Sequence, residues 1–600
     1  MKFNVMHETA RRELVTLFAS VSAVVAANAA SRYFPGEGGD IASAAEWGEA
    51  GLPTQSDSVS VNKQGTYTLS EDKTFFSFRV ENNKSTVAFG NRTLTAKASA
   101  GSYGLGVITA NAEALFTGGI FNLSGTADCR GAYNADGIHT IFTNGCVVTN
   151  ASYMYAAHTS ANSLTEIAGG TKVYATSLVV NRNTGHDNTL EIHSGGELHV
   201  SGSAHSETEG TNGDHGGERL LIHGAGSVFD HNHNNGDLLY WGYQRCSNLV
   251  GVYDHGLLKA KTGMALGNGN SSFGNCLLID NCATGIVPLV RYRGHDNSVI
   301  VSNATLTAES GFYLAYANTA SNNLFRAYGS GTVLNLPTPT TSAQLATRSD
   351  LFGSWNNDMT VTGRWNTVSL EGGVKWDCGN RDVMMAASHN STFQLGGVGT
   401  TLYSTNDSSF CLGYKGRNAL QTSCVSNRLA ILDGATFNVK QLLITGIANE
   451  ICISNATLNL AADDVGLRVG YDAYTTNCVL VMKGEASKVQ SAATGFSCVF
   501  GAGGKLRFEI PRDGYAADYV PFDVSCQFSL DATASLEVDC DEFAAHTGGK
   551  LHLIHAKSIN AATAERLTAC SLPKGCSIVV DGGDVYLKSK KMTGFVLTFH

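Results

Sequence analysis

A short phrase recurs along the middle of this chain, about every 22 to 30 residues. It consists of an asparagine, two apolar residues at alternate positions, a small polar turn with glycine or asparagine, and a second apolar alternation. One copy runs from Asn188 to Val200 and another from Asn297 to Leu306. Alternation at every second residue indicates β-strands, and recurrence at this period indicates strands stacked in successive coils. The sequence therefore predicts an all-β fold, a right-handed parallel β-helix.

The repeated phrase has a simple physical interpretation. A single coil of short strands cannot bury its apolar side, whereas coils stacked ~4.8 Å apart bury a continuous column. We expect the repeat asparagines to take left-handed φ in turns and to bond to the equivalent amide of the next coil. Further copies of the phrase begin at Asn248, Asn427, Asn449 and Asn477. An array of β-sandwiches is the alternative, but it would lack this long-range register.

The pattern divides the chain into four expected segments. Residues 1–29 are a predicted signal peptide, and residues 30–100 hold an N-terminal cap with the first strands. Residues 101–504 carry the β-helix repeats, and residues 505–600 form a β-rich C-terminal cap with a helix-prone stretch at 561–568. Caps are expected because an open strand edge would pair with other chains.

The N-terminal segment predicts export. Arg11 and Arg12 precede an apolar run over residues 14–26, and small residues follow at 27–29. This order is typical of a cleaved secretory signal, so we expect a secreted or cell-surface protein. No later segment has 18 consecutive apolar residues, and we expect no transmembrane segment in the mature chain.

The amino-acid composition argues against one class of partner, nucleic acid. Charged residues make up 15% of the chain and its net charge is −10. A sparsely charged, acidic protein lacks the basic surface that nucleic acid requires, so no nucleic-acid partner is expected. The 15 cysteines are odd in number and form no Cys-x-x-Cys pair, and most are predicted to be small buried hydrophobic residues. Cys570 and Cys576 are the candidates for a disulfide.

Histidine is concentrated in one region. Nine of the 18 histidines lie between residues 186 and 255. His193 and His223 follow equivalent inward isoleucines 30 residues apart, so we expect them to stack on one face. Imidazoles brought together in this way are candidate ligands of a divalent metal. The alternative is that they are solvent-exposed surface side chains, and no other cofactor is predicted.

Other candidate sites point less specifically to a ligand or a reaction. The tetrapeptide Gly-His-Asp-Asn occurs at 185–188 and at 294–297, either as a duplicated ligand-binding turn or, as we favour, as one turn used twice. Acidic residues are scattered, the densest groups lying at 463–464 and 539–542, and no acid/base pair can be assembled from them. No catalytic residue is therefore assigned. The aromatic side chains Tyr240, Trp241 and Tyr253 are candidates for stacking on sugar rings.

The repeated phrase, and the entry segment with Trp47, Gly51-Leu-Pro53 and Asp57-Ser-Val59, resemble a known family. They are similar to autotransporter and adhesin passenger domains with autotransporter-associated β-strand repeats, over roughly residues 45–510. The resemblance implies a bacterial adhesin-like protein that displays a rigid surface to a glycan or cell-surface ligand. Because β-helices also serve other functions, a polysaccharide lyase or glycoside hydrolase and a structural coat rod remain alternatives. Enzymatic activity is uncertain, and we favour a protein without it.

Overall fold

The computed structural model describes residues 30–590 except for short internal stretches. These stretches are 49–50, 100, 125–126, 183–184, 208–215, 235–236, 243–245, 268–271, 309–310, 315–319, 336–348, 352–362, 379–381, 386–387, 414–423, 462–464 and 471–474. Strands make up 57% of the structure and helices 4%, and parallel coils form a β-solenoid of about 16 turns. The predicted all-β parallel solenoid is confirmed. The predicted signal peptide at 1–29 lies outside the described residues.

The chain divides into two compact units, residues 1–237 and 238–600. The first contains the helix α2 (Ala44–Trp47) and the following strands. They are β1 (Ser31–Tyr33), β2 (Gly39–Asp40), β3 (Ser58–Val61), β4 (Gly65–Thr68), β5 (Lys73–Phe75), β6 (Ser77–Val80), β7 (Lys84–Ala96), β8 (Tyr103–Val107), β9 (Glu113–Asn122), β10 (Asp128–Tyr133), β11 (His139–Thr143), β12 (Val147–His158), β13 (Leu164–Ile167), β14 (Lys172–Arg182), β15 (Thr189–His193), β16 (Glu197–Val200), β17 (Ala204–Glu207), β18 (Arg219–His223) and β19 (Val228–His231).

The second unit contains α4 (Asp541–His546), α5 (Ala561–Thr568) and the remaining strands. They are β20 (Leu239–Trp241), β21 (Leu249–Tyr253), β22 (Leu257–Ala260), β23 (Met264–Leu266), β24 (Cys276–Asp280), β25 (Thr284–Ile286), β26 (Leu289–Tyr292), β27 (Ser298–Ser302), β28 (Thr305–Thr307), β29 (Gly311–Tyr313), β30 (Leu324–Tyr328), β31 (Val333–Asn335), β32 (Ser349–Leu351), β33 (Gly363–Arg364), β34 (Thr367–Glu371), β35 (Lys375–Asp377), β36 (Asp382–Met384), β37 (Ser388–His389), β38 (Thr392–Gly396), β39 (Thr401–Leu412), β40 (Arg428–Leu432), β41 (Thr436–Ile444), β42 (Glu450–Ser454), β43 (Thr457–Leu460), β44 (Val465–Val469), β45 (Cys478–Lys483), β46 (Lys488–Ser491), β47 (Ser497–Phe500), β48 (Gly504–Glu509), β49 (Phe522–Leu530), β50 (Ser535–Asp539), β51 (Gly549–Ile559), β52 (Cys576–Asp581) and β53 (Asp584–Ser589).

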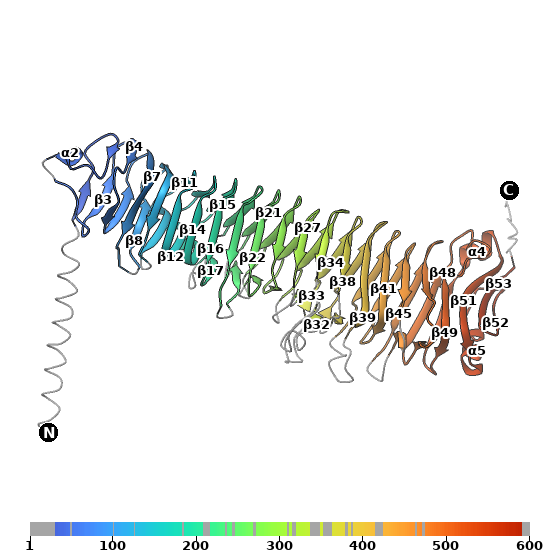
Figure 1. The fold of residues 1–600 in the computed structure, drawn as a ribbon. Coiled ribbons are helices and arrows are strands. Elements are labelled where there is room, and N and C mark those ends of the chain that lie inside the picture. The colour runs from blue at the N-terminus through green and yellow to red at the C-terminus, as the bar shows by residue number, and fades with distance from the viewer. Residues whose placement is uncertain are drawn as a thin grey trace, which may run out of the picture. The chain divides into compact units, whose positions relative to one another are not determined.

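Equivalent strands of successive coils pair in parallel within each unit (Figure 1). In the first unit, Leu190 of β15 lies beside Leu220 of β18, and Ile192 beside Ile222. All four side chains are fully buried, while Glu191 between them faces outward. The apolar alternation of the sequence thus becomes a continuous interior column. Parallel pairing already joins β1 to β3, so the stacking begins before the repeat region predicted at 101–504.

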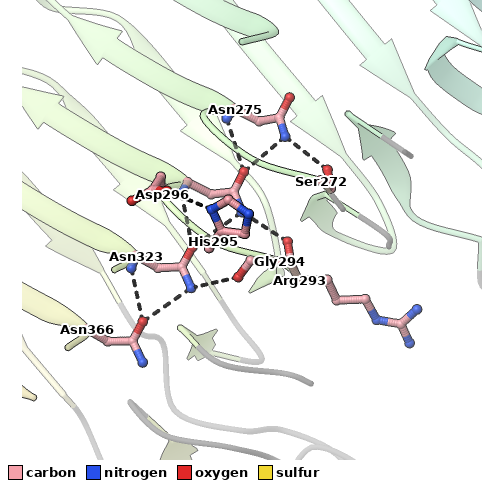
Figure 2. Close-up of polar contacts among 9 residues, drawn as sticks. Ser272, Asn275, Arg293, Gly294, His295, Asp296, Asn323 and Asn366 are labelled. Carbon is pink, nitrogen blue, oxygen red and sulfur yellow. Dashed lines mark hydrogen bonds and ion pairs between the residues drawn. The ribbon is translucent and has the colours of Figure 1, made fainter. Parts of the chain in front are cut away.

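Buried asparagines form a hydrogen-bonded ladder in the second unit (Figure 2). The Nδ2 of Asn275 donates to Oδ1 of Asn297 at 2.9 Å, and the Nδ2 of Asn297 donates to Oδ1 of Asn323 at 3.3 Å. The same oxygens accept the backbone N–H groups of Asn275 and Asn297, both at 3.0 Å. The predicted amide-to-amide bonds are confirmed, and the ladder links successive coils inside the fold.

The predicted left-handed φ is wrong for the ladder asparagines, such as Asn297 and Asn323, and is confirmed for Asn477 of the repeat phrase. Positive φ belongs to the residue before the ladder asparagine, as at Asp296 (φ 56°) and Asn322 (φ 53°). The reason is that the ladder side chain must enter the interior, so the turn is completed one residue earlier. Asn477 of the repeat phrase, with φ 55°, is such a turn residue, and Cys478 occupies the ladder position after it.

The C-terminal end of the second unit changes from parallel to antiparallel pairing. Parallel pairing continues beyond residue 504, since β48 pairs with β50 and β49 with β51. Strand β53 then pairs antiparallel with both β51 and β52. The predicted helix at 561–568 is present as α5, where the Asn560 side chain accepts a hydrogen bond from Thr563 N at 2.8 Å. In the described part of the chain, no helix combines the length and hydropathy needed to cross a membrane.

Candidate ligand-binding surface

His193 and His223 lie on the outer face of the first unit. They end the neighbouring strands β15 and β18 and are paired in register. Their rings are parallel to within 6° with centroids 5.3 Å apart, so the predicted stacking is present. The His193 Nε2 lies 3.0 Å from Glu166 Oε2, and the His223 Nε2 lies 2.6 Å from Glu191 Oε1. Each ring therefore has a carboxylate partner of its own.

The side chains around His193 and His223 are relevant to the predicted metal site at these two residues. Glu166 also binds His139, whose Nε2 lies 2.5 Å from Oε1. Burial alone would raise the pKa of Glu166, but the hydrogen bonds from His193 and His139 outweigh it and hold that pKa below its usual value. Within the described residues, neither His193 nor His223 belongs to a group of three metal-ligating side chains with mutually close donor atoms. A metal at His193 and His223 stays a prediction.

A surface hollow of about 290 Å³ lies on the first unit, at the C-terminal ends of β16 and β19. Its lining combines one exposed aromatic ring with short polar side chains. The lining residues are Asn150, Ala151, Tyr174, Ala175, Thr176, His199, Val200, Ser201, Asp230 and Asn232. Such a shallow, mixed surface can contact a ligand that presents both C–H faces and hydroxyl groups.

Four stacked coils, those of β12, β14, β16 and β19, supply residues to this hollow. Tyr174 of β14, His199 of β16 and Asp230 of β19 occupy one register position, so their side chains stand side by side. The Tyr174 and His199 rings stack at 5.0 Å with an 11° angle between planes. The His199 Nδ1 lies 3.4 Å from Asp230 Oδ2, which fixes the ring against the carboxylate. Tyr174 remains 42% exposed and can offer ring surface to a ligand.

Glu197 adds fixed charge beside the hollow. Its Oε1 lies 2.9 Å from Lys172 Nζ, and its Oε2 lies 2.9 Å from His199 Nε2. The hydrogen bond from Lys172 lowers the pKa of Glu197, and the bond from His199 acts in the same direction. Glu197 is therefore ionised at neutral pH, which suits a role in orienting His199 and does not suit donation of a proton.

A second polar cluster on this unit is mostly buried. The Arg130 guanidinium lies 2.8 Å from Asp128 Oδ2 and 4.7 Å from the centre of the Tyr133 ring. Burial, followed by the positive charges of Arg130 and Arg182, lowers the pKa of His158 to about 4. With Arg130 only 4% exposed, this cluster is better placed to join coils than to bind a ligand.

The other sequence candidates have different outcomes. Trp241 is fully buried in β20, so its prediction as an exposed sugar-stacking residue is wrong, while Tyr240 and Tyr253 are half-buried. The acidic pair at 463–464 lies outside the described residues. The hollow around Tyr174 was missed, because its members are 25 and 31 residues apart and only an alignment of the coils would have brought them together.

The two Gly-His-Asp-Asn segments form the same kind of turn. Asp187 and Asp296 have φ values of 55° and 56°. Each accepts a bond on Oδ2 from the preceding histidine, at 2.9 Å from His186 Nδ1 and at 2.6 Å from His295 Nδ1 (Figure 2 for the second). The asparagine that follows is fully buried in both. The geometry favours the interpretation of one turn used twice.

Cys570 and Cys576 do not face each other. None of the described cysteines forms a disulfide. The Cys576 Sγ lies 3.8 Å from the Sγ of Cys540, whereas the Cys570 thiol donates to the carbonyl oxygen of Leu536 at 3.1 Å. Nearness in sequence was misleading here, because the turn between the two residues directs their side chains to different neighbours.

Comparison with known proteins does not assign a family. Neither the protein-family models nor the curated proteins that were searched match this chain.

Proposed function

We propose that this protein is an exported, adhesin-like binding protein that recognises carbohydrate through the hollow around Tyr174. The observation that carries the proposal is the exposed Tyr174 ring at the edge of a concavity of about 290 Å³ with a mixed polar and apolar lining. Aromatic faces pack against the C–H face of a sugar ring, and nearby polar side chains bind its hydroxyl groups.

The polar groups of the hollow support this ligand class. Asn150 and Asn232 offer amides, Thr176 and Ser201 offer hydroxyls, and Asp230 offers a carboxylate. Together they provide both donors and acceptors, as a sugar hydroxyl requires. The ring faces are held by strands stacked in register, so little side-chain freedom is lost on binding.

Export and surface display rest on the sequence. The arginine pair and apolar run of residues 1–29 support secretion. The similarity of the repeat phrase to autotransporter passenger domains supports a role outside the cell. A solenoid suits such a role because its outer residues vary freely while the interior column is kept.

A panel of neutral and acidic polysaccharides, immobilised and incubated with the full chain, tests the proposal. We expect retention on at least one of them, and we expect Tyr174→Ala to reduce the affinity about tenfold or more, which corresponds to ~1.4 kcal/mol of stacking energy. Tyr403→Ala is the matched control, because Tyr403 is a strand tyrosine of similar exposure, 40%, outside the hollow. Equal retention of both variants, or none of the wild type, contradicts the proposal.

Polysaccharide cleavage is the second candidate, because Lys172, Glu197, His199 and Asp230 form a connected charged group beside the hollow. Glycoside hydrolysis by two carboxylates requires one of them to be protonated, and the lowered pKa of Glu197 makes it unsuited to that role. The size distribution of the same polysaccharides after incubation separates the two functions. Shortened chains would establish an enzyme, and intact chains retained on the protein would support binding.

A further inference from the structure

A compact group of metal-ligating side chains lies in the C-terminal hairpin of the second unit. His552 and His555 belong to β51, and Asp584 begins β53, the antiparallel partner of β51. In the described part of the chain, this is the one group of three such residues whose donor atoms all lie within 4.8 Å of one another.

A β-bulge places both histidines on the same face. Residues three apart in a regular strand point to opposite sides of the sheet. The pairing of β51 with β53 shifts register between His552 and Ile554, and Leu553 and Ile554 are consecutive buried residues. His552 and His555 consequently both face outward, with His555 directly opposite Asp584. Bulges commonly redirect a side chain in this way.

Two imidazole nitrogens converge on one carboxylate oxygen. Asp584 Oδ1 lies 3.0 Å from His552 Nε2 and 2.7 Å from His555 Nδ1. The His552 ring is held from the side by Tyr586, with centroids 4.6 Å apart, and its Nε2 also lies 3.0 Å from the Ile554 carbonyl oxygen. The group remains open to solvent, since the three side chains are 22%, 49% and 31% exposed.

We propose that His552, His555 and Asp584 bind a Zn²⁺ ion. Two imidazole nitrogens and one carboxylate oxygen are the ligand set that zinc accepts when water completes its tetrahedral coordination. The ligating nitrogens, His552 Nε2 and His555 Nδ1, now face the oxygens of Asp584 and Ile554. When the ion binds, the proton on each of them moves to the other ring nitrogen or to solvent, and the freed lone pair binds the ion. The ion joins β51 to the hairpin of β52 and β53, and so ties the last strands of the unit together.

The Glu166 group provides a natural comparison. It has the same composition, with His139 and His193 around one carboxylate, but the two histidines take different oxygens of Glu166. Its donor atoms do not all come within 4.8 Å of one another, since the group at Asp584 is the one described group that meets this limit. Both groups consist of two imidazoles and one carboxylate, so the types of side chain do not distinguish them. What distinguishes them is geometry, because only at Asp584 do both imidazole nitrogens approach the same carboxylate oxygen.

Calorimetry with ZnCl₂ on the full chain, after removal of metal with a chelator, tests the proposal. We expect one ion per chain at this site and a rise in the unfolding temperature of the C-terminal hairpin. Asp584→Asn and His555→Ala should each lower the affinity by more than about tenfold, since even loss of a second-shell partner has that effect. Co²⁺ in place of Zn²⁺ should give visible absorption bands that both variants lose.

The control is the double variant His193→Ala/His223→Ala, which leaves Asp584 intact. Unchanged binding in this control, together with loss in Asp584→Asn, supports the site. No heat with the wild type, or unchanged binding in both Asp584→Asn and His555→Ala, overturns it, and loss only in the control assigns the metal to His193 and His223 instead. Because His555 is about half exposed, His555→Ala should keep the fold if Asp584→Asn does not. The outcome is independent of carbohydrate binding.

Discussion

A buried amide stabilises a fold only when its donors and acceptors are paired, because an unpaired polar group in the interior costs free energy. Asn297 meets this condition in both directions. Its Nδ2 donates to the Arg293 carbonyl oxygen at 2.9 Å and to Asn323, and its Oδ1 accepts two bonds from Asn275 (Figure 2). The side chain thus connects three successive coils.

We expect Asn297→Ala to lower the free energy of unfolding by about 1–3 kcal/mol, because the N–H groups of Asn275 lose their acceptor in the interior. Urea unfolding followed by circular dichroism measures the change. Asn335→Ala is the control, since Asn335 is exposed on β31 and should change stability by less than about 0.5 kcal/mol. Equal effects of the two substitutions would show that the ladder does not stabilise the unit.

The buried His158 should make the stability of the fold depend on pH. The groups around it are Arg130 and Arg182, whose charges oppose its protonation, and the rings of Tyr133 and Tyr155. The folded chain keeps this imidazole neutral down to about pH 4, compared with an ordinary pKa of 6.5. Between these values the unfolded chain binds more protons, so stability falls as the pH falls.

We therefore expect the wild type to lose up to about 3 kcal/mol more than His158→Gln when the pH is lowered from 7 to 4. Denaturant unfolding of both proteins at several pH values measures this difference, and the variant cancels the contribution of other titrating groups. Parallel pH profiles for the two proteins would contradict the lowered pKa.

At the scale of elements, α5 covers strand ends that would otherwise be open. Thr563 Oγ1 accepts a hydrogen bond from the backbone N–H of Leu530 at 3.2 Å, and the Arg566 guanidinium donates to the Leu530 carbonyl oxygen. Both backbone groups lie at the end of β49. The helix thus supplies partners that another coil would provide elsewhere in the solenoid.

Thr563→Val should lower the stability of the C-terminal end of the second unit by about 1–3 kcal/mol, because the buried N–H of Leu530 loses its acceptor while side-chain volume is kept. Hydrogen exchange at Leu530 should accelerate in parallel. Thr568→Val, on the exposed side of the same helix, is the matched control and should change neither quantity. Protection of Leu530 that is the same in both variants would refute this role of α5.

Features of the fold that depend on local sequence could be predicted, and features that depend on the stacking of coils could not. The alternation around Leu190 and Ile192 predicted inward strands because burial follows a period of two residues. Helix α5 was predictable because residues 561–568 are helix-prone by themselves, whatever they pack against. The position of the left-handed turn residue, the bulge at His552 and the hollow at Tyr174 were not, because each depends on how one coil lies upon the next.

At the scale of the whole molecule, a stacked solenoid has strand edges that continue its own pattern, and such edges invite further pairing. The antiparallel hairpin of β52 and β53 interrupts that pattern, since β53 binds the outer edge of β51 in the opposite direction. An incoming parallel strand would find this edge already occupied.

Deletion of residues 549–600 should make the protein self-associate, because it leaves the edge of β49 without β51. Light scattering after size-exclusion chromatography should detect species whose mass grows with concentration. Deletion of residues 591–600 alone keeps the hairpin and serves as the control. A monomeric product from the longer deletion would mean that the hairpin does not protect the edge.

The asparagine ladder has a consequence for the history of the chain. The steps from Asn275 to Asn297, Asn323 and Asn366 span 22, 26 and 43 residues, yet each is closed by the same amide bond. A gene segment that encodes one coil can therefore be copied, lost or lengthened at its loops while the register of the others is kept. Homologous proteins should differ in the number of coils and in loop length far more than in the residues that point inward.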